Sequence, residues 1–376
     1  MAPKSDAIII GGGIVGLATA AHLVRRGWKV AVLERHHPGA GSTGRCLGGV
    51  RSQFSTVGVI RLMERSVAQF RRMEGEFGRP VGYVEGGYLF LAHSAERLAE
   101  RERLLRRQRE HGLPVRTLTA AECRQLVPGL DGEGLLGGVY SPADGQADPF
   151  AVVGGYVESI RRGGGTVEFP VEVTGLESAG HRITGVVTGR GERRPAGHVV
   201  IAAGPWCADV GRLAGLELPV RAETREALVT DRLPPLLKPM LVDGRPDGCT
   251  FCQRPNGQVI GCFTSPSPRT GLETTVTRQF LVQMAKRMVR LLPALATAQV
   301  IRQWSGWYEM TSDGLPVIGE TSLRGLYVAG GMSGHGFMMG PGTGEYLAEL
   351  MDGGQTTLDG SEFKPDRSFA GAETLI

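Results

Sequence analysis

The sequence predicts an α/β fold built on a parallel sheet, and two observations point to it. Residues 7–34 contain an apolar strand, a glycine turn, a helix and a second strand, which together make a βαβ unit with a parallel strand pair. Glycine accounts for 57 of the 376 residues, about twice its usual share. These glycines cluster beside apolar runs without a Gly-X-Y period, which indicates backbone packed closely around a large ligand.

The composition is that of a globular protein, and at about 100–200 residues per domain its length suggests two domains or one elaborated domain. Hydrophobic residues make up 41% and charged residues 21% of the chain, and the formal net charge is +4. Because this charge is small and dispersed, we expect no nucleic-acid partner. Residues 7–24 carry no charged side chain, but four glycines and His22 interrupt the run, so we expect neither a signal peptide nor an integral membrane segment.

The cysteines and histidines predict no disulfide framework and no metal site. Six cysteines are scattered over the chain without a secretory signal, which favours reduced thiols and a cytoplasmic protein. Cys249 and Cys252 have CxxC spacing but no second pair, so a structural strand is favoured over zinc or an iron–sulfur cluster. The eight histidines show no metal-ligand spacing.

The remaining elements follow from apolar runs and from glycine or proline punctuation. Strands are expected at residues 7–10, 29–34, 81–92, 167–176, 186–187, 198–201 and 326–329, with further strand-like runs within 218–305. Helices are expected at residues 14–26, 57–77, 95–111, 148–162, 277–292 and 341–351, with a short one within 113–130. No fixed repeat or linker is visible, so we expect two interleaved domains.

Two segments are expected to face solvent. The helix at residues 95–111 carries six arginines and four glutamates, and their mixed signs at helical spacing indicate a solvated face rather than an anion site. The last twenty or so residues are polar and are expected to be loosely held.

The glycine turn after the first strand predicts a dinucleotide site. Gly11-Gly-Gly-Ile-Val-Gly16 satisfies GxGxxG, follows a strand and opens a helix, and Glu34 ends the next strand about twenty residues later. Gly11 would permit the tight turn, Gly13 would let a pyrophosphate approach the helix N-terminus, and Gly16 would allow close helix–strand packing. The Glu34 carboxylate would accept hydrogen bonds from ribose hydroxyls.

Three further segments distinguish FAD from NAD. Residues 42–51 are small and rich in donors, residues 199–206 are a strand ending in Ala-Ala-Gly, and residues 326–337 lead from a strand into a glycine turn at a helix start. NAD enzymes do not need a late glycine turn of this kind, whereas a flavin lying across the sheet does. The expected cofactor is therefore FAD.

Four motifs together resemble the FAD-dependent D-amino-acid oxidase (DAO) superfamily, which includes glycine oxidase and sarcosine oxidase. The motifs are GGGIVG with Glu34-Arg35, the segment 42–51, IAAGPW, and SDGLPVIG followed by GLYVAGGMSGHGF, and they span residues 7–345. Within the family, the chain is most similar to the β subunits of sarcosine oxidases and of dye-linked L-proline dehydrogenases, and to glycine oxidase.

The resemblance implies a Rossmann-like FAD-binding domain with a glutathione-reductase-like sheet, interleaved with an α+β substrate domain on a mostly antiparallel sheet. The FAD domain would comprise residues 1–80, 140–217 and 306–376, and the substrate domain residues 81–139 and 218–305. The implied FAD-contacting residues are Gly11, Gly13, Ile14, Val15, Gly16, Glu34, Arg35, Ser42, Thr43, Arg45, Cys46, Leu47, Gly48, Gly49, Val173, Ala203, Gly204, Trp206, Gly306, Gly330, Gly331, Gly334, His335, Gly336, Phe337 and Met338.

Departures from the family pattern predict non-covalent FAD and a different substrate anchor. No cysteine follows Cys262, and residues 145–149 contain no histidine, so the attachment points of the covalent flavins in related sarcosine oxidases are absent. Met338 stands where monomeric sarcosine oxidases carry the lysine that holds the substrate carboxylate.

Three residues are the candidates for contact with the substrate. Arg51 follows the Gly48-Gly49 doublet and can offer bidentate hydrogen bonds to a carboxylate, although a structural salt bridge is the alternative. Tyr308 is a weaker candidate, as a phenol that hydrogen-bonds the substrate. His335 lies between two glycines and would tune the flavin ring or touch the substrate, unless only its backbone N–H matters.

The expected function is FAD-dependent oxidation of an amino acid or secondary amine of the sarcosine, glycine, proline or D-amino-acid type. Hydride transfer from carbon to flavin N5 gives an imine and requires no dedicated base. Two alternatives stay open: a 2-hydroxy acid or polyol-phosphate dehydrogenase on the same fold, and a non-catalytic flavin subunit of a larger complex.

Dyes or a second electron-transfer subunit are expected to accept electrons better than oxygen does. The sequence places no lysine with certainty near the flavin, and such a positive charge would favour the reaction with oxygen. Met332, Met338 and Met339 would offer adaptable apolar surface to a partner, although such methionines usually fill gaps in a core.

Overall fold

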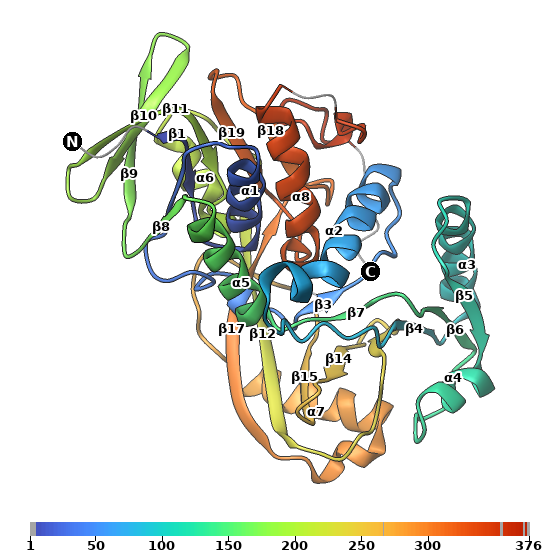
Figure 1. Ribbon diagram of the computed structural model, residues 1–376. Coiled ribbons are helices and arrows are strands. Elements are labelled where there is room, and N and C mark those ends of the chain that lie inside the picture. Colours follow the sequence, from blue (N-terminus) through green and yellow to red (C-terminus); the bar gives the residue numbers. More distant parts are fainter. Residues whose placement is uncertain (1–4, 266, 354–355, 371–372, 374–376) are drawn as a thin grey trace.

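The computed structural model describes residues 5–265, 267–353, 356–370 and 373, whose strands form two large sheets. Figure 1 shows the first sheet with α1 and α8 beside it in the upper part of the view, and the second sheet with α7 below. The chain passes between the two sheets several times. The mixed α/β fold that the sequence predicts is confirmed.

The first sheet has a parallel centre formed by neighbouring strands in the order β19-β11-β1-β2-β8. β18 pairs antiparallel with β19 at one edge, and the β9–β10 hairpin extends from β11. The bounds are β1 Ser5–Ile10, β2 Val30–Leu33, β8 Thr166–Glu168, β9 Val173–Ala179, β10 Arg182–Thr188, β11 Arg193–Ile201, β18 Val317–Glu320 and β19 Leu326–Gly330. The central strands are apolar runs because helices and loops cover both faces.

The second sheet is mostly antiparallel and follows the order β16-β12-β15-β14-β13-β4-β6-β5, with β17 on the other side of β12. Its one parallel pair is β13 with β4. The bounds are β4 Tyr88–Ala92, β5 Arg116–Thr119, β6 Gly137–Ser141, β12 Arg221–Arg232, β13 Met240–Asp243, β14 Thr250–Gln253, β15 Gln258–Cys262, β16 Arg269–Thr270 and β17 Val300–Met310. β3 (Gly49–Val50) and β7 (Gly145–Gln146) form a separate short ribbon.

The helices divide between the two sheets, and four short 3₁₀ turns complete the set. The helices are α1 Ile14–Arg25, α2 Val57–Phe77, α3 Ala95–Glu110, α4 Ala120–Leu126, α5 Pro149–Arg162, α6 Cys207–Arg212, α7 Arg278–Leu291 and α8 Gly336–Met351. The 3₁₀ turns are η1 Thr43–Arg45, η2 Gly204–Trp206, η3 Pro293–Thr297 and η4 Ser361–Phe363. Within the described part, no helix is both long and apolar enough to cross a membrane.

The long strands β12 and β17 belong to the second sheet and also contact the 3₁₀ turns that flank the first sheet: β17 contacts η1 and η2, and β12 contacts η2. They pair antiparallel from Arg221 opposite Met310 to Thr230 opposite Val300. In Figure 1 they extend from beneath the first sheet down to α7. β6 and β17 cross the expected boundaries at residues 139–140 and 305–306, and the division into two domains stays a prediction.

The last helix begins earlier than the sequence predicts, because Pro341 lies inside α8 rather than at its start. A proline inside a helix removes one backbone N–H and crowds the preceding turn. Side chains of α2 hydrogen-bond the backbone around the proline. The Gly342 N–H donates to Ser66 Oγ at 2.8 Å, and Gln69 Nε2 donates to the Pro341 carbonyl at 3.2 Å.

Two segments that were expected to face solvent or to be loosely held do so only in part, because each also makes buried contacts. On α3, Arg101 and Gln108 are buried, and Gln108 Nε2 donates to the Phe54 carbonyl at 3.0 Å, because this helix lies against β4 and β6. Near the chain end, Arg367 forms hydrogen bonds of 2.9 and 3.0 Å with the buried carboxylate of Asp313. Residues 354–355, 371–372 and 374–376 of that stretch lie outside the described residues.

The expected strand at residues 167–176 is two strands in the structure. β8 ends at Glu168 and β9 begins at Val173, with Pro170 between them. Proline has no N–H to donate to a neighbouring strand, so it ends the ladder at this point.

Gly344→Ala is expected to lower the free energy of unfolding by about 1–3 kcal/mol through overpacking. A Cβ at Gly344 would lie 2.5 Å from backbone atoms of Ala18 and Thr19, where α8 crosses α1. The matched control is Gly75→Ala at an exposed position of α2, where a Cβ meets nothing within 4 Å. This control should gain about 0.5–1 kcal/mol from helix propensity. Denaturant unfolding of both variants measures the difference, and equal shifts would contradict the proposed close crossing.

Candidate functional site

One cleft gathers most of the predicted site residues. Its volume is about 1260 Å³, and its wall includes the turn after β1, the loop at residues 40–49, β17 and the start of α8. Small-molecule pockets usually measure about 300–1,000 Å³. This cleft therefore has room for a dinucleotide together with a small second molecule.

All but three of the predicted contact residues line this cleft, including Arg51, Tyr308 and His335. The exceptions are Gly16, Gly330 and Gly331, which lie behind its wall. A Cβ at Gly16 would collide with the Gly11 carbonyl oxygen, so Gly16 provides the close helix–strand packing that the sequence predicts for it. A Cβ at Gly330 would lie 2.7 Å from Cys207 Sγ, which shows that this glycine is also needed for packing.

The N-termini of α1 and α8 both face the cleft, and their N-cap residues Gly13 and His335 make no side-chain cap. In contrast, Ser94, Asp148 and Thr277 cap α3, α5 and α7. The first backbone N–H groups of a helix have no partner within the helix, and the helix dipole favours negative charge beside them. The Ile14 N–H of α1 donates to Thr43 Oγ1, and the remaining N-terminal N–H groups of the two helices are suited to anionic or electron-rich ligand atoms.

Glu34 holds the glycine turn in place. Its Oε2 accepts a hydrogen bond from the Gly12 N–H at 2.7 Å, and its Oε1 accepts one from the His36 N–H at 2.8 Å. Thr43 Oγ1 accepts from the Ile14 N–H at 3.1 Å. This bracing of the turn by Glu34 is a role that the sequence analysis did not predict.

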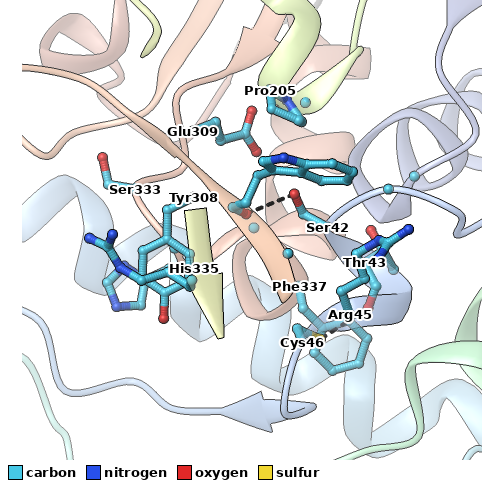
Figure 2. A pocket seen from close by; sticks show the side chains of 18 of the residues that line it. Ser42, Thr43, Arg45, Cys46, Pro205, Tyr308, Glu309, Ser333, His335 and Phe337 are labelled. Carbon is cyan, nitrogen blue, oxygen red and sulfur yellow. Dashed lines mark hydrogen bonds between the residues drawn. The ribbon is translucent and has the colours of Figure 1, made fainter. Parts of the chain in front are cut away.

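The loop at residues 40–49 is attached to β17 by hydrogen bonds. Ser42 Oγ donates to the Trp307 carbonyl at 2.8 Å, the bond drawn as a dashed line in Figure 2. Arg45 Nη1 donates to the Ser305 carbonyl at 3.0 Å, and the Trp304 indole N–H donates back to the Arg45 carbonyl at 2.9 Å. These contacts bring a loop and a strand more than 250 residues apart in the chain into one wall.

Arg51 and His335 form the polar centre of the deep end. Arg51 is only 3% exposed, and its Nη2 lies 2.9 Å from His335 Nε2. Its Nη1 donates to the Gln53 carbonyl at 2.5 Å, and its Cζ lies 4.2 Å from the centroid of the Phe54 ring. The alternative role considered for Arg51, a structural salt bridge, is not found among the described residues.

The contact with Arg51 determines the protonation state of His335. A guanidinium can only donate, so Nε2 must accept and the proton of the neutral ring must lie on Nδ1. Burial, and after it the charge of Arg51, lower the pKa of His335 well below its usual value, which keeps the ring neutral. Nδ1 has no hydrogen-bond partner within the described chain. His335 therefore has one N–H to offer to a ligand.

Tyr308 and Glu309 follow each other on β17 and lie near the start of α8, as Figure 2 shows. The Tyr308 ring packs against Gly334, where any side chain would collide with it. Burial raises the pKa of Tyr308, so its phenol stays protonated. Glu309 Oε2 accepts from the Gly331 N–H at 3.2 Å, and burial raises the pKa of this carboxyl to about 7.

Tyr88, Phe90, Arg101 and Glu309 are among the lining residues that the sequence analysis missed. Tyr88 and Phe90 alternate along β4, so a period-two pattern could have placed them on one face. Arg101, Leu105 and Gln108 are spaced as one buried face of α3, which the many charges of that helix concealed. Glu309 follows the predicted Tyr308 directly, but nothing in the sequence signals its burial.

The cleft fits a flavin dinucleotide held without a covalent bond. Besides His335 Nδ1, the buried Trp307 Nε1 lacks a partner within the described residues, so both can donate to acceptor atoms of a ligand. Of the cysteines in the wall, Cys46 is in the loop next to the expected flavin. Burial raises the pKa of its thiol to about 12, which makes it a poor nucleophile.

Comparisons with known proteins agree with this geometry. Residues 6–350 match the DAO family, described as FAD dependent oxidoreductase. The chain is 30% identical to a glycine oxidase of Geobacillus kaustophilus, with 98% of both chains covered. It is also 30% identical to a sarcosine oxidase subunit beta of Rhizobium meliloti, with 97% of this chain and 88% of that chain covered.

A solved structure gives the same result. The crystal structure of L-proline dehydrogenase from P. horikoshii superposes with a TM-score of 0.92 at 32% identity and covers 97% of this chain and 98% of the other. The resemblance read from the four motifs is thereby confirmed. The chain belongs to the DAO family of FAD dependent oxidoreductases.

Proposed function

We propose that this enzyme oxidises the carbon–nitrogen bond of a small amino acid or secondary amine to an imine at the Arg51–His335 end of the cleft. The observation that carries the proposal is the buried Arg51 guanidinium, whose hydrogen-bond partners are a carbonyl and a neutral imidazole. Glu373 and Asp144 act on this buried charge from a distance, but within the described residues no carboxylate pairs with it directly. A substrate carboxylate would supply a direct partner through charge-assisted hydrogen bonds.

The chain's own residues bind and orient the reactants. FAD, when bound, supplies the two-electron acceptor that the amine requires. The glycine turn and the N-terminus of α1 are suited to its pyrophosphate, and the Nδ1–H of His335 and the N-terminus of α8 can donate to electron-rich ring atoms. Arg51 would orient the substrate, and the protonated Tyr308 phenol can donate a hydrogen bond to it.

Relatives support an amine rather than a 2-hydroxy acid as the substrate. Their names are glycine oxidase, sarcosine oxidase subunit beta and L-proline dehydrogenase. A second subunit as electron acceptor stays part of the proposal, and the β-subunit relative supports it. The prediction that methionines offer an apolar surface to such a partner is wrong, however. Met332, Met338 and Met339 are all buried in the core, where they fill the space around α8.

Anaerobic bleaching of the flavin tests the reaction directly. The FAD-loaded protein is mixed without oxygen with sarcosine, glycine, proline and D- and L-amino acids, and the loss of flavin absorbance is followed. At least one should bleach the flavin rapidly, and dyes should reoxidise it faster than oxygen does if a second subunit is the natural electron acceptor, as the β-subunit relative suggests. Bleaching only by 2-hydroxy acids or glycerol 3-phosphate would overturn the proposal.

Gly13→Val should abolish FAD retention while leaving the fold intact. A Cβ at Gly13 would meet only Thr43 Oγ1, at 3.4 Å, so the protein itself has room for it, whereas the space before the helix N-terminus would be filled. Gly197→Val is the control, because a Cβ there has similar room, at 3.5 Å from the Asp6 carbonyl oxygen, and neither residue lines the cleft. Flavin content after gel filtration and the circular dichroism spectrum measure both effects; full flavin content in Gly13→Val would refute the assignment.

Arg51→Ala should raise the KM of the amino-acid substrate about ten- to a hundredfold with FAD content nearly unchanged. Loss of a charge-assisted hydrogen bond costs about 1.5–3 kcal/mol, which corresponds to that range. Arg51→Lys keeps the charge without the bidentate geometry and should fall between the two. Steady-state kinetics with a dye acceptor measure KM, and an unchanged value would make Arg51 a structural residue and favour Tyr308 as the anchor.

A further inference from the structure

We propose that Arg101 is a second anion anchor, so that the substrate carries a second carboxylate besides the one bound by Arg51. This inference rests on the proposed function and specifies its substrate class. It assigns a substrate-specificity role to a residue of α3, a helix whose charges the sequence predicted to face solvent.

Arg101 is a buried cation without a partner. It is 7% exposed, it lines the cleft, and it forms no hydrogen bond or ion pair within the described residues. Its Cζ lies 4.5 Å from the centroid of Phe90, another lining residue. Burial, and after it the charge of Arg51, lower the pKa of Arg101 to about 10, so the side chain still carries its charge at neutral pH.

Three other arginines that line the cleft are paired with carboxylates, unlike Arg101. Arg97 pairs with Glu100 at 2.8 Å, Arg225 with Glu223 at 2.7 Å, and Arg245 with Asp243 at 2.7 Å. The carboxylate of Glu100, which acts on Arg101 electrostatically, is therefore already paired with Arg97. Of the arginines in the described chain, Arg51 and Arg101 are the two buried ones, and neither forms an ion pair with a carboxylate.

An uncompensated buried charge lowers stability, and well-packed apolar residues often replace such groups at no cost to the fold. If Arg101 served only to cover Phe90, a methionine or leucine would do so without losing solvation. A guanidinium that is kept charged, buried and open to a cleft is explained when an anion enters that cleft.

The two arginines are placed to bind one molecule. Arg51 Cζ lies 5.4 Å and Arg101 Cζ 4.5 Å from the same Phe90 ring centroid, so the two carbons are less than about 10 Å apart. A guanidinium–carboxylate pair brings its heavy atoms to about 2.8 Å. Two such pairs and a short carbon chain fit this separation. The structure thus favours a dicarboxylic amino acid or an amine bearing two carboxymethyl-type groups.

Binding of non-oxidisable acids to the FAD-loaded protein tests the second anchor apart from catalysis. Isothermal titration calorimetry compares glutarate, with two carboxylates, and butyrate, a monocarboxylate of similar length. Glutarate should bind the wild-type protein at least about tenfold more tightly. Arg101→Met should remove this preference while leaving butyrate affinity unchanged. Arg97→Met, which alters an ion-paired arginine of the same wall, should keep it.

Arg101→Lys distinguishes the loss of an anion anchor from misfolding. This variant keeps the positive charge and should retain part of the preference for glutarate. The melting temperature of Arg101→Met should stay level or rise, since an unpaired buried charge is removed. Equal affinities of the wild-type protein for the two acids, or an equal loss of both in Arg101→Met, would overturn the second anchor.

Flavin bleaching by glutamate, N-methylglutamate and iminodiacetate, compared with glycine and sarcosine, then separates the two proposals. If dicarboxylic amines bleach the flavin faster and Arg101→Met raises only their KM, both proposals are supported. If only monocarboxylic amines react, the second anchor fails and the amine oxidation stands. If no amine reacts while glutarate still binds through Arg101, the anion site stands and the proposed reaction fails.

Discussion

The parallel alignment of β1, β11 and β19 is the constraint on which the site depends. These strands are neighbours in the first sheet, so their carboxyl ends meet at one edge. Three turns leave that edge: the glycine turn into α1, the Ala202–Trp206 segment, and the turn into α8. Segments separated by more than 300 residues in the chain therefore line one cleft, and the N-termini of α1 and α8 face it together.

Residues that sit in these turns were predictable from the sequence, because a glycine pattern between a strand and a helix is a local signal. Gly13, Gly204 and His335 all line the cleft as expected. Tyr88 and Arg101 come from the second sheet and its covering helix, and their positions depend on how the two sheets meet. The predicted start of the last helix at Pro341 was wrong for a related reason. Ser66 and Gln69 of α2 hydrogen-bond the backbone around this proline, and no local pattern reveals partners so distant in sequence.

The electrostatics of the cleft are uneven along its length. At one end the carboxylate of Glu34 already accepts two backbone N–H groups, and the anion-binding capacity comes from the helix N-terminus. At the other end two buried guanidinium groups lack counter-ions. A neutral imidazole, His335, accepts from Arg51 without cancelling its charge. This arrangement separates a site suited to a phosphate group from one suited to carboxylates.

The attachment of β17 to the loops of the first sheet has a consequence for how molecules reach the cleft. β17 belongs to the second sheet, but the Trp307 carbonyl accepts from Ser42 Oγ and the Glu309 carbonyl accepts from the Ser333 N–H. A hinge between the sheets would have to break these hydrogen bonds. Ligands must therefore enter and leave the cleft through movements of loops and side chains at its rim. Turnover should then respond to solvent viscosity and to substitutions at the rim more than to changes that stiffen the strands.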